Sequence, residues 1–163
     1  KILIDKNLKY LEVAIKKSCL IKLNIVDKDF KESKNRMRLN FGHTFAHAIE
    51  SRSGFSQKLN HGEAVLIGML IATKISKLLK ICSKNSLDDL VNIYERNNFQ
   101  FYLEKFNKKK QLIELIKYMI NDKKNNDEKI NLILLKKIGL TTTPGTKKFS
   151  KKKLTDIFIR LNN

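Results

Sequence analysis

Apolar residues recur at helical spacing through most of the chain. Between positions 8 and 26, leucine, isoleucine and alanine stand three or four residues apart with lysines between them, which predicts one long helix or two short ones. The same period predicts further helices over residues 36–51, 61–80, 86–97 and 110–120. We therefore expect a mainly α-helical chain.

Cap residues and a change of period complete the expected order of elements. Ser86, which is followed by two aspartates, and Ser150 are typical helix N-caps, and Ser150 predicts a last helix over 154–161. The branched apolar run 130–138, bounded by Gly139, predicts a strand. A second short strand within 141–148 would form a small β-hairpin near 130–148. We find no repeat or linker, so 1–163 is predicted to be a single helical domain.

The formal charge of +18 in 163 residues raises the question of a phosphate-bearing partner. The lysines are scattered among asparagines and isoleucines along the whole length, which is typical of solvated surface. The sequence also lacks tryptophan, zinc-finger spacing and an RNP-type pattern. A dedicated nucleic-acid module is therefore disfavoured, and a basic binding module is kept only as a rival reading.

The cysteine content and the lengths of the apolar runs indicate the cellular location to expect. The two cysteines, Cys19 and Cys82, are far apart and form no metal-binding or redox spacing, so a reducing, cytoplasmic location is expected. The longest apolar stretch, 64–73, is too short for a bilayer, so no membrane partner is expected. The chain opens at Lys1, which suggests a fragment of a larger protein.

All three histidines, His43, His47 and His61, fall between positions 43 and 61. If 36–51 is helical, the first two share one face with Arg36, Asn40 and Glu50, at steps of four and three. This stripe contains no lysine, although lysine is the usual surface residue of the chain. Its residue types bind metals, anions and sugar hydroxyls, so we interpret it as the wall of a polar cavity.

The spacing His43-xxx-His47 can bind one divalent metal ion, as in zinc proteases. Thr44 follows His43 where the protease motif needs glutamate, so the motif is incomplete. Shortly after it, His61-Gly62-Glu63 opens the next helix, with Glu63 in the first turn where negative charge suits the helix dipole. From spacing alone, His61 is either a further ligand or an ordinary helix-opening residue.

Longer motifs carry a specific resemblance. The run LNFGHTFAHAIE at 39–50, followed by HGEAV at 61–65, closely resembles 3-dehydroquinate synthase. Lys22, Asp29, Glu32 and Arg36 stand at the family's distances from Asn40, and Asp122-Lys123-Lys124 resembles a later family element. The resemblance covers most of the chain and implies the helical carboxy-terminal domain of that fold. The family's NAD-binding amino-terminal domain, which supplies a glutamate metal ligand, has no counterpart here.

The resemblance implies a role for each matching residue. His43 and His61 would bind a divalent metal, zinc or cobalt, whereas His47 would contact substrate and transfer protons. Lys22 and Asn40 would take part in catalysis and substrate binding. The remaining substrate contacts would come from Glu32, Arg36, Lys123 and Lys124. No residue of this chain is expected to bind NAD.

The implied reaction converts 3-deoxy-arabino-heptulosonate 7-phosphate to 3-dehydroquinate and phosphate, a step of the shikimate pathway toward aromatic amino acids. A related sugar-phosphate cyclase or a metal-dependent polyol dehydrogenase is the alternative within enzymes. The resemblance further implies a homodimer for the full-length enzyme. The isolated chain is expected to be inactive, because the NAD-binding part and one metal ligand would be missing.

Overall fold

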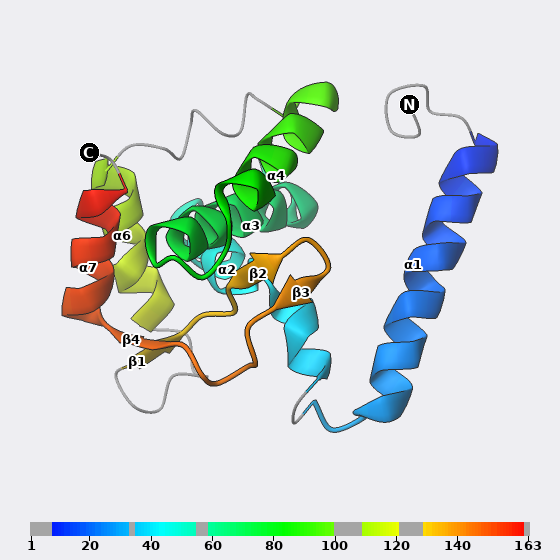
Figure 1. Ribbon diagram of the computed structural model, residues 1–163, viewed down its shortest axis with the longest axis horizontal. Helices are drawn as coiled ribbons and strands as arrows, with labels where there is room; N and C mark the ends of the chain where they lie inside the picture. The colour runs from blue at the N-terminus through cyan, green and yellow to red at the C-terminus, as the bar shows by residue number, and fades with distance from the viewer. Residues whose placement is uncertain (1–7, 33–34, 55–58, 100–108, 121–128, 162–163) are drawn as a thin grey trace.

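The computed structural model of the chain describes residues 8–32, 35–54, 59–99, 109–120 and 129–161. Helices dominate it, and two pairs of short antiparallel strands lie beside them (Figure 1). The elements in chain order are α1 (Leu8–Lys28), the 3-10 helix η1 (Arg36–Asn40), α2 (His43–Arg52), α3 (His61–Leu78), α4 (Lys84–Arg96), α6 (Lys109–Ile120), β1 (Lys129–Asn131), β2 (Leu135–Lys137), β3 (Leu140–Thr141), β4 (Lys148–Ser150) and α7 (Lys151–Arg160). The predicted mainly helical fold with a small β element is confirmed.

Helix α3 forms the centre of the main core. It is apolar on nearly every side, and a helix of that kind is stable only when other elements surround it. Helices α2 and α4 and strand β2 pack against it, and α6 and α7 extend the core beyond α2 (Figure 1). The largest fully buried side chains of these helices are Phe45, Ile49, Ile67, Ile75, Leu115, Ile116, Met119, Leu154 and Phe158.

Helix α1 differs from the other α-helices because it buries none of its residues. It lies to one side of the core in Figure 1, and its main contacts are with η1. Leu8, Leu20 and Leu23 are among its exposed apolar residues. No helix in the described part of the chain is long and apolar enough to cross a membrane.

The segment 36–51 is not one helix, and in this respect the prediction is wrong. It forms η1 up to Asn40 and then restarts as α2 at His43. The break is at Gly42, whose φ of +84° is in the left-handed region that favours glycine. The stripe predicted on one helical face is therefore divided between two short elements, with Arg36 and Asn40 on η1 and the histidines on α2.

Two glycines allow α2 and α3 to approach closely. A Cβ added at Gly68 of α3 would collide with the carbonyl oxygen of Gly42. A Cβ at Gly42 would lie 2.7 Å from the backbone nitrogen of Met69, closer than real Cβ contacts allow. The two helices run antiparallel, since the start of α2 meets the middle of α3 while Glu50, near the end of α2, reaches His61 at the start of α3.

The predicted single strand over 130–138 is also wrong. It is divided into β1, which pairs with β4, and β2, which pairs with β3 across a turn where Gly139 has a φ of +80°. The residues between β1 and β2 are buried without strand pairing. Their backbone is satisfied by single hydrogen bonds, from Leu132 N to the Lys147 carbonyl oxygen and from Thr142 N to the Leu134 carbonyl oxygen. At the start of β2, the Ser76 hydroxyl accepts from the Leu135 backbone nitrogen at 2.9 Å and ties β2 to α3.

Two helix starts differ from the expected ones. Ser83, and not Ser86, caps α4, since its side chain accepts from the backbone nitrogen of Ser86. Ser150 caps α7 as predicted, but the helix begins at Lys151, three residues before the expected start. In both cases the first turn consists of polar residues, so the apolar period alone placed the helix start too late.

Candidate metal and substrate site

The three histidines of the chain converge in space. The ring centroids of His43 and His61 are 5.5 Å apart, those of His43 and His47 5.9 Å, and those of His47 and His61 6.2 Å. His43 and His47 are one turn apart on α2, and His61 comes from α3. The antiparallel packing of α2 and α3 therefore assembles the cluster.

His43 and His61 are each the first residue of a helix. Gly42 precedes α2, and Asn60 caps α3 in a reciprocal capping box with Glu63. The start of a helix carries partial positive charge, which disfavours the protonated form of an imidazole placed there. At His43 this favours the neutral imidazole, the form that binds metal ions.

The surroundings of His43 lower the pKa of its imidazole. Burial between the helices lowers its pKa below the ordinary 6.5, and the neighbouring His47 and His61 lower it further. The Phe41 carbonyl oxygen, 3.4 Å from Nδ1 of His43, and the carboxylate of Glu50 act in the opposite direction. Burial is the largest of these effects, so His43 is neutral at pH 7.

Glu50 fixes the orientation of His61. Its Oε1 lies 2.9 Å from Nδ1 of His61, and the carboxylate is only 16% exposed whereas the imidazole is 56% exposed. A neutral His61 donates its Nδ1 proton to this carboxylate, which leaves the Nε2 lone pair free. Glu50 is part of the stripe predicted around the histidines, but no role was predicted for it. Its position three residues after His47 could have indicated a place in the site. Its contact with His61 is visible only in the folded structure.

The donor set fits a divalent metal only in part. Two imidazoles that bind one metal ion at about 2.1 Å with a tetrahedral angle have ring centroids roughly 5 Å apart. The His43–His61 pair, at 5.5 Å, is the nearest of the three pairs to that value. Within the described residues, no group of three or more histidine, cysteine, aspartate or glutamate side chains is arranged to hold a metal ion. The chain thus offers an incomplete ligand set.

A second polar group lies directly before the histidines. The backbone nitrogen of Arg36 donates to Asp29 Oδ2 at 3.0 Å, and its Nη1 donates to the Phe30 carbonyl oxygen at 2.8 Å. Asn40 Nδ2 donates to Glu32 Oε1 at 2.7 Å, and Glu32 Oε2 lies 3.9 Å from Arg36 Nε. These contacts hold η1 against the turn that follows α1. They bring together three predicted substrate residues, Glu32, Arg36 and Asn40.

Lys22, the predicted residue on α1, is not part of that group. It is exposed, and no hydrogen bond or ion pair joins it to a histidine, Arg36 or Asn40 among the described residues. The predicted Lys123 and Lys124 lie outside the described residues. The structure therefore brings together His43, His47 and His61 in one cluster and Glu32, Arg36 and Asn40 in another.

Known proteins similar in sequence identify the family. A family model described as 3-dehydroquinate synthase C-terminal matches residues 1–125. The 3-dehydroquinate synthase of Pelagibacter ubique is 45% identical over 130 residues, which are 80% of this chain and 35% of that protein. That of Dictyoglomus turgidum is 41% identical over 137 residues, 84% of this chain and 37% of that protein. The chain thus spans about a third of the length of these curated relatives.

Solved structures support the same fold. A crystal structure of 2-deoxy-scyllo-inosose synthase in complex with carbaglucose-6-phosphate, NAD+ and Co2+ superposes with a TM-score of 0.74 at 22% identity, over 93% of this chain and 41% of that one. A 2-epi-5-epi-valiolone synthase from Streptomyces hygroscopicus with NAD+ and Zn2+ gives a TM-score of 0.67 at 15% identity, over 95% of this chain and 41% of that one. At this identity the likeness shows the fold alone. The family assignment comes from the sequence matches: this chain belongs to the 3-dehydroquinate synthase family and corresponds to its carboxy-terminal part.

Proposed function

We propose that this chain is the metal- and substrate-binding part of a 3-dehydroquinate synthase, which converts 3-deoxy-arabino-heptulosonate 7-phosphate to 3-dehydroquinate and phosphate. The observation that carries the proposal is the convergence of His43, His47 and His61 directly after the Glu32–Arg36–Asn40 group. The names of the sequence relatives support it. The NAD+ and Co2+ or Zn2+ named with the structural neighbours support the cofactors.

His43 and His61 are the residues that would hold the metal, because both begin helices and their geometry leaves imidazole nitrogens available. A bound zinc or cobalt ion would act as a Lewis acid on substrate oxygens. The remaining ligand would come from a residue outside those the structure describes, in agreement with the incomplete set found here. NAD would be held by a part of the enzyme outside this chain.

Arg36 and Asn40 would orient the substrate. Arg36 uses Nη1 for the Phe30 carbonyl, so other guanidinium N–H groups remain for a carboxylate or phosphate. Asn40 donates to Glu32 through its amide nitrogen, which leaves the amide oxygen to accept from a substrate hydroxyl. Glu32 thereby positions both residues. Lys22, Lys123 and Lys124 would add positive charge around the substrate anion.

His47 would move protons and not bind metal. Its side chain is exposed, whereas His43 is half-buried, and its ring is farther from each of the other two rings than those two are from each other. An exposed imidazole beside bound substrate can accept a proton from a substrate hydroxyl through a ring nitrogen and return it later. This role distinguishes our proposal from a His43-xxx-His47 chelate.

The test compares the three histidines by Co2+ titration of the chain, followed by absorption spectroscopy. His43→Ala and His61→Ala should each abolish the cobalt spectrum, whereas His47→Ala should leave the dissociation constant within about threefold. Loss of cobalt in His47→Ala as complete as in His43→Ala would contradict the assignment.

Turnover requires the whole enzyme. A chimera in which this chain replaces the matching part of the Pelagibacter ubique relative should release phosphate from the heptulosonate phosphate when NAD and zinc are supplied. A folded, metal-loaded and NAD-loaded chimera without phosphate release would refute the proposed reaction.

A further inference from the structure

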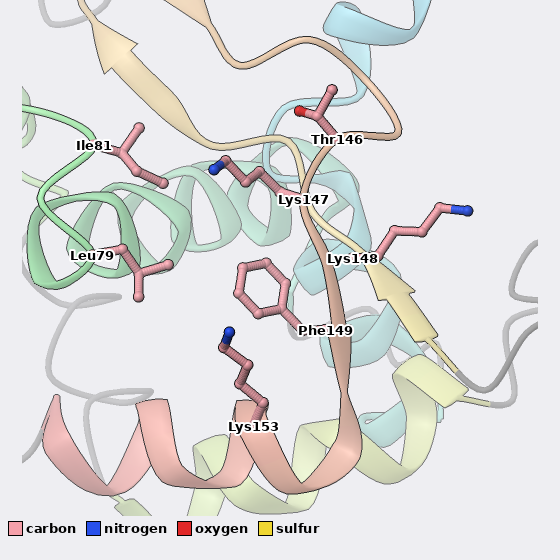
Figure 2. A pocket seen from close by; sticks show the side chains of 7 residues that line it. All are labelled: Leu79, Ile81, Thr146, Lys147, Lys148, Phe149 and Lys153. Atoms are coloured by element: carbon pink, nitrogen blue, oxygen red, sulfur yellow. The ribbon is translucent and has the colours of Figure 1, made fainter.

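An open pocket of about 330 Å3 lies beyond the carboxy-terminal end of α3, bordered by β4 and the first turn of α7 (Figure 2). His61 begins α3 and Leu79 follows its last residue, so at 1.5 Å per residue the pocket is about 27 Å along the helix from the histidine cluster. It is therefore separate from the metal and substrate site. None of the residues that line it was predicted to bind a ligand.

The floor of the pocket is apolar. Phe149 is held there by the pairing of β4 with β1, in which it stands opposite Ile130 and faces inward while Lys148 and Ser150 face outward. Leu79 and Ile81, from the segment that follows α3, form the opposite side (Figure 2). Leu79 and Ile81 are partly exposed and Phe149 is buried at 5% exposure, and apolar side chains at the bottom of a pocket favour a ligand with an apolar body.

The rim of the pocket is cationic. Lys147 and Lys153 extend along it in Figure 2, whereas Lys148 turns away. The ammonium nitrogen of Lys153 lies 6.0 Å from the ring centroid of Phe149. The Thr146 hydroxyl adds a polar group, and no acidic residue is found among the described residues that line the pocket. A ligand here would meet two ammonium groups and, beneath that of Lys153, an aromatic ring.

The charge at the start of α7 is electrostatically unfavourable without a ligand. Helix starts carry partial positive charge and favour acidic residues in the first turn. The first turn of α7 instead contains Lys151, Lys152 and Lys153 and no acidic residue. Positive side chains thus add to the positive end of the helix dipole next to the pocket. A bound anion would neutralise this charge.

We propose that this pocket is a second binding site, specific for a small anion with a single aromatic ring. The ring would occupy the apolar floor formed by Leu79, Ile81 and Phe149, and the anionic group would lie between Lys147 and Lys153. The volume is at the lower end of that of small-molecule sites, which limits the ligand to about one ring and its charged substituent.

Phenyl phosphate is a suitable probe, and its binding to the 163-residue chain can be followed by NMR titration. The amide signals of Ile81 and Phe149 should shift on binding. Lys153→Gln should weaken binding at least fivefold. The matched control is Lys152→Gln, which removes an exposed charge from the same helical turn outside the pocket and should change the dissociation constant less than twofold. Equal weakening by both variants would overturn the proposal, because it would show a general charge effect.

Two further measurements test the apolar floor. Inorganic phosphate should bind at least fivefold more weakly than phenyl phosphate, and Phe149→Leu should weaken phenyl phosphate binding at least threefold. Phe149 is part of the core, so thermal unfolding of this variant is measured alongside; if it does not fold, the comparison of the two phosphates decides the point. Equal affinity for both phosphates, or phenyl phosphate shifts confined to His43 and His61, would overturn the proposal.

Discussion

Removing the carboxylate of Glu50 should weaken metal binding through its effect on His61. The 2.9 Å contact joins a carboxylate that is 16% exposed to an imidazole that is 56% exposed. A hydrogen bond to a charged group contributes about 1.5–3 kcal/mol, and the exposure of His61 favours the lower end. Glu50→Ala should therefore raise the Co2+ dissociation constant about tenfold, since 1.4 kcal/mol corresponds to a factor of ten. Glu50→Gln keeps an acceptor but loses the charge and should raise it about threefold.

Co2+ titration of the chain, with the visible absorption spectrum as readout, checks this order. Glu95→Gln is the matched control, because it removes an exposed carboxylate of α4 and should leave cobalt affinity unchanged. The cobalt spectrum of Glu50→Ala should also change in shape, since the His61 ring is no longer held in one orientation. If Glu50→Ala binds Co2+ within twofold of the unaltered chain and with the same spectrum, the positioning role of Glu50 is refuted.

Four further outcomes are expected. The chain on its own should release no phosphate from the heptulosonate phosphate with NAD and zinc supplied, because its described residues offer an incomplete ligand set; measurable release would contradict this. In the chimera, Arg36→Lys should lower kcat/KM about 10- to 100-fold through loss of a guanidinium–anion contact, and Lys152→Gln should leave it unchanged. Gly68→Ala should lower the free energy of unfolding by about 1–3 kcal/mol because its Cβ meets the Gly42 carbonyl, while Gly62→Ala, which meets only Asn60 Oδ1 at 3.5 Å, should be tolerated in the same denaturant titration. Stability should fall as pH drops below about 6.5, because the unfolded chain then takes up a proton that half-buried His43 resists; His43→Gln should flatten this part of the pH–stability curve.

The helices were predicted well where the apolar residues recur at helical spacing. Helix α3 is apolar on nearly every side and α6 carries a clear apolar face, so both were located within two residues of their observed ends. The prediction treated η1 and α2 as one helix, because the apolar period does not reveal the left-handed turn at Gly42. It also merged β1 and β2, whose separate pairings depend on distant partners. Contacts between segments far apart in sequence decide such boundaries, and no local pattern contains them.

The candidate site was likewise predicted only in part. Residue type and spacing singled out His43, His47 and His61 as a group, and the structure brings their rings together. The Glu50–His61 contact could not be predicted, because it depends on the antiparallel packing of α2 and α3. The apolar floor and lysine rim beyond α3 were not predicted either, since their residues come from segments far apart in the sequence whose proximity only the fold establishes.

The close approach of α2 and α3 has a consequence for evolution. His43 follows Gly42 directly, and the contact between Gly42 and Gly68 is made by main-chain atoms. The position of this histidine relative to α3 is thus set by the backbone and does not depend on which apolar side chains fill the core around it. Core residues such as Phe45 or Ile67 can therefore be exchanged over time for others of similar volume without moving the site. The metal-binding geometry can be inherited even where the composition of the core is not.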